Sequence, residues 1–254
     1  MGKSLVQKQF CAHSKDYVTS KVHAQGLSLA RLVELTQPGS DWVVLDVSTG
    51  AGHTALAFAS RVKTVIACDV TPEMIQVARE LTDERGVNNV EFRPADAQEL
   101  PFPDDMFDLV TNRIALHHYA NARKAISEMA RVCKQGSLVA LVDNIVPPEK
   151  QTAGYINHFE KMRDPSHNWC YPLVWLEAVF GDAKLKVEHS ETVAKELEFE
   201  PWVDRMGVNA ETKAKLRDWL MNAPGEAREH LTPRVDGDRM FFSLTEGIVI
   251  GRKT

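Results

Sequence analysis

The sequence predicts an α/β protein built on a doubly wound, mostly parallel sheet. Short apolar segments typical of strands alternate with amphipathic segments typical of helices between residues 43 and 142. This βαβ rhythm places helices on both faces of a parallel sheet. With 254 residues and 44% hydrophobic content, the chain can bury a substantial core. We therefore expect a single domain.

The first half of the chain supplies five of the expected strands. They are predicted at residues 43–47, 64–68, 89–93, 107–111 and 137–142. Helices are predicted at residues 24–35, 53–60, 72–85 and 122–133. Thr71 before Pro72 indicates where the third of these helices begins, and Gly86 indicates where it ends.

The rhythm breaks at Pro147-Pro148. Residues 149–180 are typical of a helical and irregular insertion, which precedes a strand at 185–193. Short helices are expected at 200–206, 211–221 and 226–230, and a last strand at 240–250. We find no internal repeat or linker, which agrees with one elaborated domain.

A glycine turn follows the first strand, in the segment VVLDVSTGAGHTA that begins at Val43. Glycines let the backbone turn sharply and approach a ligand closely, and the next helix directs its N-terminal N–H groups to the same place. The segment from Gly50 also fits the G-x-G-x-x-G/A dinucleotide fingerprint, with Asp69 about 20 residues onward as the expected ribose acid. A nucleotide-type cofactor is therefore expected, of one of two classes.

Asp46 separates the two classes by its charge. A carboxylate beside the glycine turn would repel the pyrophosphate of NAD(P), whereas it would attract the sulfonium and ammonium groups of S-adenosylmethionine. The sign of the interaction favours the methyl donor. The plainer alternative is that Asp46 merely caps the turn.

Composition and charge exclude several classes of partner. A net charge of −5 gives no broad basic surface for nucleic acid, and no apolar run is long enough for a membrane span or an export signal. Four cysteines are scattered without C-x-x-C spacing, at positions 11, 68, 133 and 170. We expect a cytoplasmic protein with reduced thiols and no structural zinc. The sequence does not determine the oligomeric state, and a homodimer is one of the states that it allows.

Several segments in order resemble the class I S-adenosylmethionine-dependent methyltransferases, in the type 11 or ubiquinone/menaquinone-biosynthesis-like branch. The matching segments, between residues 41 and 143, are VVLDVSTGAGHTALAFA, ACDVTPEMIQVARE, VEFRPADAQELPFPDDMFDLVTNRIALHH and AISEMARVCKQGSLVALVD. The resemblance implies a Rossmann-like sheet of seven strands whose last strand, 240–250, is antiparallel. It also implies S-adenosylmethionine as cofactor and methyl transfer to a small-molecule acceptor.

The resemblance further implies which residues hold the methyl donor. The methionine end would be held by Asp46, Ser48, Gly50, Gly52, Asn112 and Arg113. The adenosine end would be held by Asp69, Val70, Met74, Asp96 and Ala97. An N-terminal segment would fold over the cofactor and contribute Tyr17 and Ser20. Ser48 stands where the family usually has glycine, and its hydroxyl can hydrogen-bond the carboxylate of the cofactor.

Methyl transfer is an in-line displacement that mainly requires positioning. An oxygen or nitrogen acceptor also loses a proton, for which histidine is a suitable base near neutral pH. The candidates are His117, His118 and His167. Packing and hydrogen bonding are the plainer roles for these residues. No metal is expected, because the nearby carboxylates lack ligand spacing.

Three other functions compete with small-molecule methylation. An NAD(P)-dependent oxidoreductase would keep the fingerprint but place Asp46 beside phosphate. A nucleic-acid or protein-amide methyltransferase is disfavoured, because Asn112-Arg113-Ile114-Ala115 replaces the Asn/Asp-Pro-Pro-aromatic run of those enzymes. The third is a non-catalytic S-adenosylmethionine-binding protein. The leading hypothesis divides the domain 1–254 into a helical cap (1–40), a cofactor-binding core (41–145) and helical substrate-side elements (146–182 and 195–235).

Overall fold

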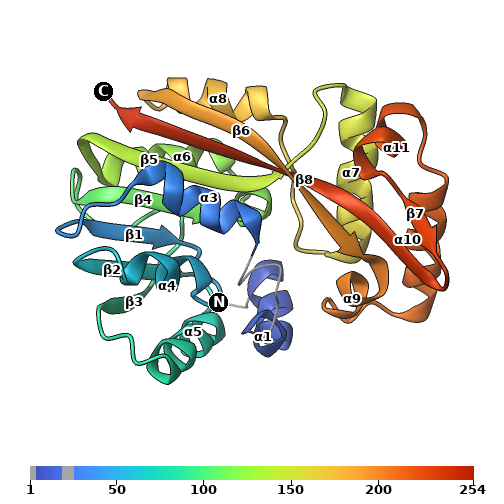
Figure 1. Ribbon diagram of the computed structural model, residues 1–254, viewed down its shortest axis with the longest axis horizontal. Coiled ribbons are helices and arrows are strands. Elements are labelled where there is room, and N and C mark those ends of the chain that lie inside the picture. The colour runs from blue at the N-terminus through green and yellow to red at the C-terminus, as the bar shows by residue number, and fades with distance from the viewer. Residues whose placement is uncertain (1–3, 19–25) are drawn as a thin grey trace.

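The sheet has the mostly parallel order that the sequence predicts (Figure 1). A computed structural model describes residues 4–18, with side chains through residue 11, and residues 26–254. Its strands are β1 (Val43–Val47), β2 (Thr64–Asp69), β3 (Val90–Pro94), β4 (Phe107–Arg113), β5 (Cys133–Ile145), β6 (Leu185–Glu198), β7 (Arg234–Asp236) and β8 (Arg239–Lys253). They follow the order β3-β2-β1-β4-β5-β8-β6, with β7 paired to β8. The reversal of strand order falls between β1 and β4.

The direction of the last strand confirms the prediction. β1 to β5 pair in parallel, whereas β8 lies antiparallel between β5 and β6. The sequence did not predict β7, a short strand that pairs with the start of β8. Its residues are exposed, so the chain carries no alternation of buried and exposed positions there.

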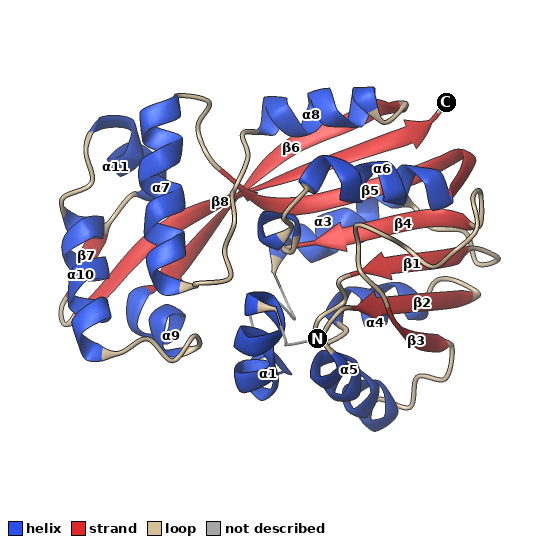
Figure 2. Cartoon of the chain, turned by 180° about the vertical axis from the view of Figure 1, so that it is seen from behind, coloured by secondary structure: helices blue, strands red, loops and turns tan. Residues whose placement is uncertain are grey.

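Helices cover both faces of the sheet (Figure 2). They are α1 (Leu5–Val18), α3 (Leu27–Thr36), α4 (His53–Ala59), α5 (Pro72–Glu84), the 3-10 turn η1 (Leu116–His118), α6 (Ala122–Val132), α7 (Lys150–Arg163), α8 (Leu173–Asp182), α9 (Phe199–Asp204), α10 (Ala210–Met221) and α11 (Gly225–Leu231). Alternate residues of a strand enter different cores. Leu45 of β1 packs in one cluster with Ile126 of α6, and Val44 packs in another with Phe58 of α4.

A further core lies beyond the carboxyl end of β5, where β6 and β8 continue among α7, α9, α10 and α11 (Figures 1 and 2). Phe159 of α7 stacks on Trp202 of α9 with ring centroids 5.0 Å apart, and Phe242 of β8 meets both rings edge-on. β8 belongs to both regions, because its residues Ile248 and Val249 pack in the sheet cores. The two long strands therefore join the sheet to the helical elements that we expect on the substrate side.

α1 lies beside α5 at the edge of this junction (Figure 1). Gln7 donates a hydrogen bond from Nε2 to the carbonyl of Val70, 2.9 Å away, and Gln9 reaches the carbonyl of Met206 at 3.3 Å. The helix thus bridges the end of β2 and the region of α9. Within the described residues, no helix is long and apolar enough to span a membrane.

Candidate active site

A cavity of about 340 Å³, here called the cofactor pocket, opens at the carboxyl ends of β1, β2 and β4. This is the point where the strand order reverses, the place where doubly wound sheets bind ligands. Eight of the residues predicted to bind cofactor line it: Ser48, Gly50, Asp69, Val70, Met74, Asp96, Ala97 and Arg113. α1 closes one side through Val6, Gln7 and Phe10.

Three other predicted cofactor residues do not line the pocket, and two lie wholly or partly outside the described part of the chain. Asp46, Gly52 and Asn112 stand behind the pocket wall rather than on it. The backbone of Tyr17 belongs to α1, but its side chain lies outside the described part of the chain, as does Ser20 altogether.

The glycine turn adopts conformations that favour glycine. Gly50 has a φ of +54° and Gly52 a φ of +86°. A side chain at Gly52 would also meet the Cβ atom of Ala78 at 3.1 Å, so the turn packs closely on α5. Asp69 holds the turn in place, because its Oδ2 accepts from the Gly50 amide at 3.0 Å and its Oδ1 from the Thr71 amide at 2.8 Å.

Asp46 supports the same turn from below. Its carboxyl accepts hydrogen bonds from Thr49 Oγ1 at 2.6 Å and from Thr111 Oγ1 at 2.9 Å, and the residue is 1% exposed. Burial raises the pKa of Asp46 to about 6, although both hydroxyl donors oppose the rise. A contribution of this charge to a bound cation therefore acts across the turn rather than by contact.

Ser48 has a φ of +55°, a left-handed conformation that is unusual for a residue with a side chain. Its hydroxyl lies 2.7 Å from the hydroxyl of Tyr119, and Tyr119 also accepts from Asn112 Nδ2 at 2.8 Å. Asn112 Nδ2 donates its second hydrogen to the carbonyl of Val47, which fixes the orientation of the amide.

These contacts connect Ser48 to Asn112 through Tyr119. Asn112 donates to the Tyr119 oxygen, and in the contact between Ser48 and Tyr119 either hydroxyl can be the donor. Ser48 and Tyr119 both line the cofactor pocket. Tyr119 is a residue that the sequence analysis missed.

After β4 the chain turns at Ile114, which has a φ of +55° and donates its amide to the carbonyl of Val142 at 2.7 Å. A β-branched residue in this conformation is strained, a feature that clusters at functional sites. The turn leads directly into η1, which carries His117 and His118.

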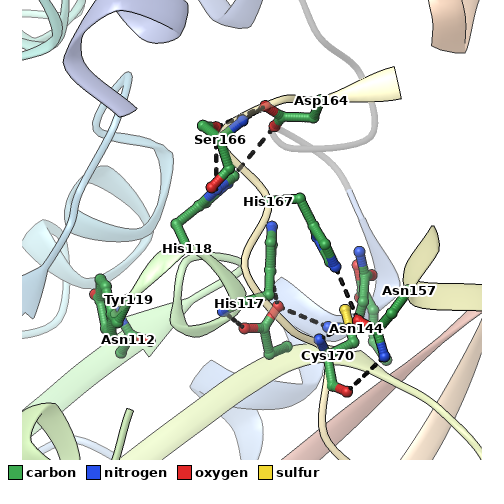
Figure 3. Close-up of polar contacts among 12 residues, drawn as sticks. Asn112, His117, His118, Tyr119, Asn144, Asn157, Asp164, Ser166, His167 and Cys170 are labelled. Atoms are coloured by element: carbon green, nitrogen blue, oxygen red, sulfur yellow. Dashed lines mark hydrogen bonds and ion pairs between the residues drawn. The ribbon is translucent and has the colours of Figure 1, made fainter. Parts of the chain in front are cut away.

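The three candidate histidines meet in space (Figure 3). The ring centroid of His117 lies 4.1 Å from that of His118 and 5.4 Å from that of His167. They line a second cavity of about 60 Å³, here called the histidine cavity. His118, Phe10 and Ile114 line both cavities, so the two are neighbours.

His117 forms a buried pair with Asp143 of β5. The Nδ1 atom of His117 lies 2.6 Å from Asp143 Oδ1, and the His117 amide donates to Oδ2 at 2.8 Å. Burial opposes the charged imidazole, but Asp143 outweighs burial and raises the pKa of His117. Since Asp143 engages Nδ1, the Nε2 atom of His117 is left for the cavity.

His118 and His167 behave in the opposite way. Burial lowers the pKa of both, and the charge of His117 lowers both further. His118 also packs edge-on against Phe10, with ring centroids 5.1 Å apart. Of the three rings, His117 therefore has the highest pKa, and burial favours the neutral form of the other two.

The sequence analysis missed Asp143 and Glu160. Asp143 directly follows the apolar run of residues 138–142, much as Asp69 follows the apolar run of β2, and that shared position could have identified it. Glu160, a residue of α7 that lines the histidine cavity, has no such signal. Among the described residues, no group of three or more His, Cys, Asp or Glu is arranged to hold a metal ion.

Comparisons with known proteins agree with this architecture. Residues 45–141 match the family model described as a methyltransferase domain. The uncharacterized methyltransferase YcgJ of Bacillus subtilis is 35% identical over 96% of this chain and 97% of its own length. Its crystal structure superposes with a TM-score of 0.85 over 89% of this chain and 97% of that chain.

Two further relatives extend the comparison. A putative methyltransferase from Bacillus halodurans is 35% identical, with a TM-score of 0.84 over 89% of this chain and 98% of that chain. A ubiquinone/menaquinone biosynthesis C-methyltransferase of Pseudomonas putida is 36% identical, but over 46% of this chain and 48% of its own length. Nothing in the comparisons supports a dinucleotide oxidoreductase or a non-catalytic binding protein.

The cofactor is S-adenosylmethionine, and the chain is an enzyme. It belongs to the class I S-adenosylmethionine-dependent methyltransferases, in the type 11 branch that includes the ubiquinone/menaquinone biosynthesis enzymes.

Proposed function

We propose that the enzyme methylates a small-molecule acceptor whose reactive group enters the histidine cavity, and that His117 is the base. The observation that carries this proposal is the shared wall of the two cavities, at His118, Phe10 and Ile114. A group in the histidine cavity would thus stand beside the cofactor pocket, next to the buried pair of His117 and Asp143.

The residues of the cofactor pocket fit the methyl donor. When bound, S-adenosylmethionine supplies an electrophilic methyl group on a sulfonium. Asp69 lines the pocket with a carboxylate that would accept ribose hydroxyls, and Val70 and Met74 offer apolar contact to adenine. Asp96 would accept from the adenine amino group, beside Ala97. At the other end, Ser48 offers a hydroxyl and Arg113 a positive charge to the methionine carboxylate.

His117 has the features of a positioned base. Asp143 fixes its ring and tautomer, as an orienting carboxylate does in hydrolytic triads. The raised pKa makes His117 the most basic of the three rings. His118 would hold the acceptor beside the methyl group, and His167 would line the far wall.

The first test is calorimetric titration of the purified protein with S-adenosylmethionine, followed by assay of S-adenosylhomocysteine release with small-molecule pools. We expect one donor site per chain and acceptor-dependent release. The proposal is wrong if the folded protein binds the donor but never turns over with any pool, or turns over only with nucleic acid or protein.

We further propose a cytoplasmic location. Cys68, Cys133 and Cys170 are buried thiols, and burial raises the pKa of each. Such thiols suit a reducing compartment. Fractionation of the native host, with an antibody to the protein, would test the location, and sedimentation would test whether it forms a homodimer.

A further inference from the structure

Two buried oxygen atoms at the histidine cavity have no hydrogen-bond partner within the described part of the chain. They are Oε1 of Glu160, a residue 4% exposed, and Oδ1 of Asn144, a residue 8% exposed. Both residues line the cavity. Buried polar atoms are nearly always satisfied in native proteins, so a pair of exceptions at one cavity indicates a missing hydrogen-bond donor.

His167 adds an acceptor to the cavity rather than a donor. His167 Nε2 lies 2.8 Å from Asn157 Oδ1, which also accepts from the Cys170 amide, so Nε2 carries the hydrogen and Nδ1 is bare. His118 Nδ1 lies 3.3 Å from the carbonyl of Ser166, and its Nε2 lies 4.0 Å from Asp164 Oδ2. Figure 3 shows both contacts directed away from His117.

The positive charges of the cavity have partners of their own. Lys195 forms an ion pair with Glu246 at 2.7 Å, and Arg163 donates to the carbonyl of Trp202 at 3.0 Å while lying over its ring at 4.4 Å. Arg205 also lines the cavity. These cations disfavour a ligand group that is itself permanently positive. They have no such effect on a neutral group that donates hydrogen bonds.

We propose that the histidine cavity receives an uncharged amino group, held by Glu160 and Asn144, and that the enzyme methylates the nitrogen of a small amine. This inference rests on the proposed function and names its substrate class. An amino group has two hydrogens for the two unpartnered oxygens, whereas a hydroxyl has one. A carboxylate or phosphate acceptor has no hydrogen to offer to these two oxygens.

The uncharged amine is also the reactive form, because its nitrogen keeps a lone pair. On transfer the nitrogen–carbon bond forms and the sulfur–carbon bond breaks, leaving its electron pair on sulfur. The nitrogen then loses one hydrogen as a proton, which the neutral form of His117 accepts at Nε2, so the step requires a pH at which that ring is unprotonated. The three products are the N-methylamine, S-adenosylhomocysteine and a protonated imidazole.

Three fluorinated probes of similar size test the inference without knowledge of the natural acceptor. They are 2,2,2-trifluoroethylamine, which is largely uncharged near neutral pH, 2,2,2-trifluoroethanol and trifluoroacetate. Each is titrated into the protein saturated with S-adenosylhomocysteine, and binding is measured by fluorine NMR. We expect the amine to bind about fivefold or more tightly than the alcohol, since it makes one more hydrogen bond to a buried acceptor. Trifluoroacetate is expected to bind most weakly.

Variants of Glu160 locate the binding. Glu160→Gln keeps the shape of the side chain and Glu160→Met removes its polar atoms, so we expect the preference for amine to shrink in the first and vanish in the second. Glu160→Met should fold at least as well as the wild type, because it removes a buried atom that lacks a partner. Glu211→Gln, on the surface of α10, is the matched control and should keep the wild-type preference.

The inference is overturned if the alcohol or trifluoroacetate binds as tightly as the amine, or if none of the probes binds, which is the result expected of a cavity that holds only water. It is also overturned if both Glu160 variants keep the preference. These results differ from failure of the proposed function, which would appear as absent methyl-donor binding in calorimetry or as no turnover with small molecules.

Discussion

The cofactor pocket and the histidine cavity are built in opposite ways. In the cofactor pocket, Asp69 is engaged by backbone amides of the turn that it supports, and the lining comes mainly from segments that directly follow β1, β2 and β4. The histidine cavity combines segments far apart in the chain, from Phe10 to Arg205, and contains oxygens that lack partners. Among the described residues, buried oxygens without a hydrogen-bond partner occur at both places, at Asn112 behind the cofactor pocket and at Glu160 and Asn144 in the histidine cavity.

The family likeness follows the same division. The matched region, residues 45–141, includes the glycine turn and ends before Asp143, Glu160 and His167. In our proposal, the matched region would bind the methyl donor, and the helical elements after β5 would form most of the acceptor side. We infer that relatives that match only about half of the chain share the donor chemistry without sharing the acceptor.

The largest effect is expected from a substitution that weakens binding of the methyl donor and leaves the histidine cavity unchanged. Asp69→Ala removes the carboxylate that holds the turn and faces the pocket, so we expect S-adenosylmethionine affinity to fall about 100-fold or more in calorimetry. Asp83→Ala, an exposed position on α5, is the control and should bind normally. Wild-type affinity in the Asp69 variant would contradict the assignment of the pocket.

The next largest effect is expected from a substitution in the histidine cavity. Asp143→Asn removes the negative partner of His117, so burial is no longer outweighed and the pKa of His117 falls below its ordinary value of 6.5. Imidazole resonances followed by NMR would show the change. The loss of a buried ion pair should also cost about 3 kcal/mol of stability in urea unfolding. Donor affinity should stay within about twofold of wild type.

The stability lost in Asp143→Asn should decrease as the pH rises. The folded-state pKa of His117 is raised, so the stabilisation from its charge is fully present below 6.5 and is lost as pH rises through the folded value. The stability difference between wild type and Asp143→Asn should therefore be larger at pH 6 than at pH 9. An equal difference at both values would show that the pair is not ionic.

A smaller effect is expected from a substitution in the hydrogen-bonded series Ser48, Tyr119 and Asn112, which lies beside the glycine turn. Tyr119→Phe leaves a hydrogen of Asn112 without a partner and frees Ser48 to turn away from the pocket. We expect donor affinity to fall about fivefold and stability to fall by about 1–2 kcal/mol. Tyr155→Phe removes a hydroxyl bonded to the carbonyl of Trp219, in the distant helical core, and should lower stability without changing affinity.

The smallest effect concerns the residue that replaces glycine. Ser48→Gly relieves the left-handed strain but loses the contact with Tyr119, so stability should change by less than about 0.5 kcal/mol while donor affinity falls about threefold. Gln37→Gly relieves similar strain, at a φ of 42°, outside the cofactor pocket. Gln37→Gly should raise the free energy of unfolding by about 0.5–1 kcal/mol and leave the affinity for the methyl donor unchanged. A gain of affinity in Ser48→Gly would exclude a binding role for the hydroxyl.

Local signals made much of the fold predictable. Leu29, Leu32, Val33 and Thr36 are buried at the helical spacing that predicts α3, and α5 begins after Thr71 at Pro72 as expected. The position of Asp69 on the cofactor pocket was also predictable, because it ends β2 and parallel strands end at one edge of the sheet. β7 was missed because exposed residues carry no periodic signal.

The acceptor side was less predictable because it depends on long-range packing. The sequence shows His117, His118 and His167 but not that they meet, which requires α7 and its following loop to fold back on η1. The burial of Glu160 depends on its neighbours in three dimensions. Asp46 lies at the end of its strand as predicted, but the sequence did not show that its carboxyl would be buried against Thr49 behind the turn.

The most direct test of the division between a cofactor pocket and an acceptor-binding histidine cavity is a crystal structure of the enzyme with S-adenosylhomocysteine and trifluoroethylamine. We predict adenosine at Asp69, the homocysteine carboxylate at Ser48, the sulfur facing His118, and the amine in the histidine cavity between Glu160 and Asn144. A cofactor bound in the reverse direction, or an amine found only outside the histidine cavity, would contradict it.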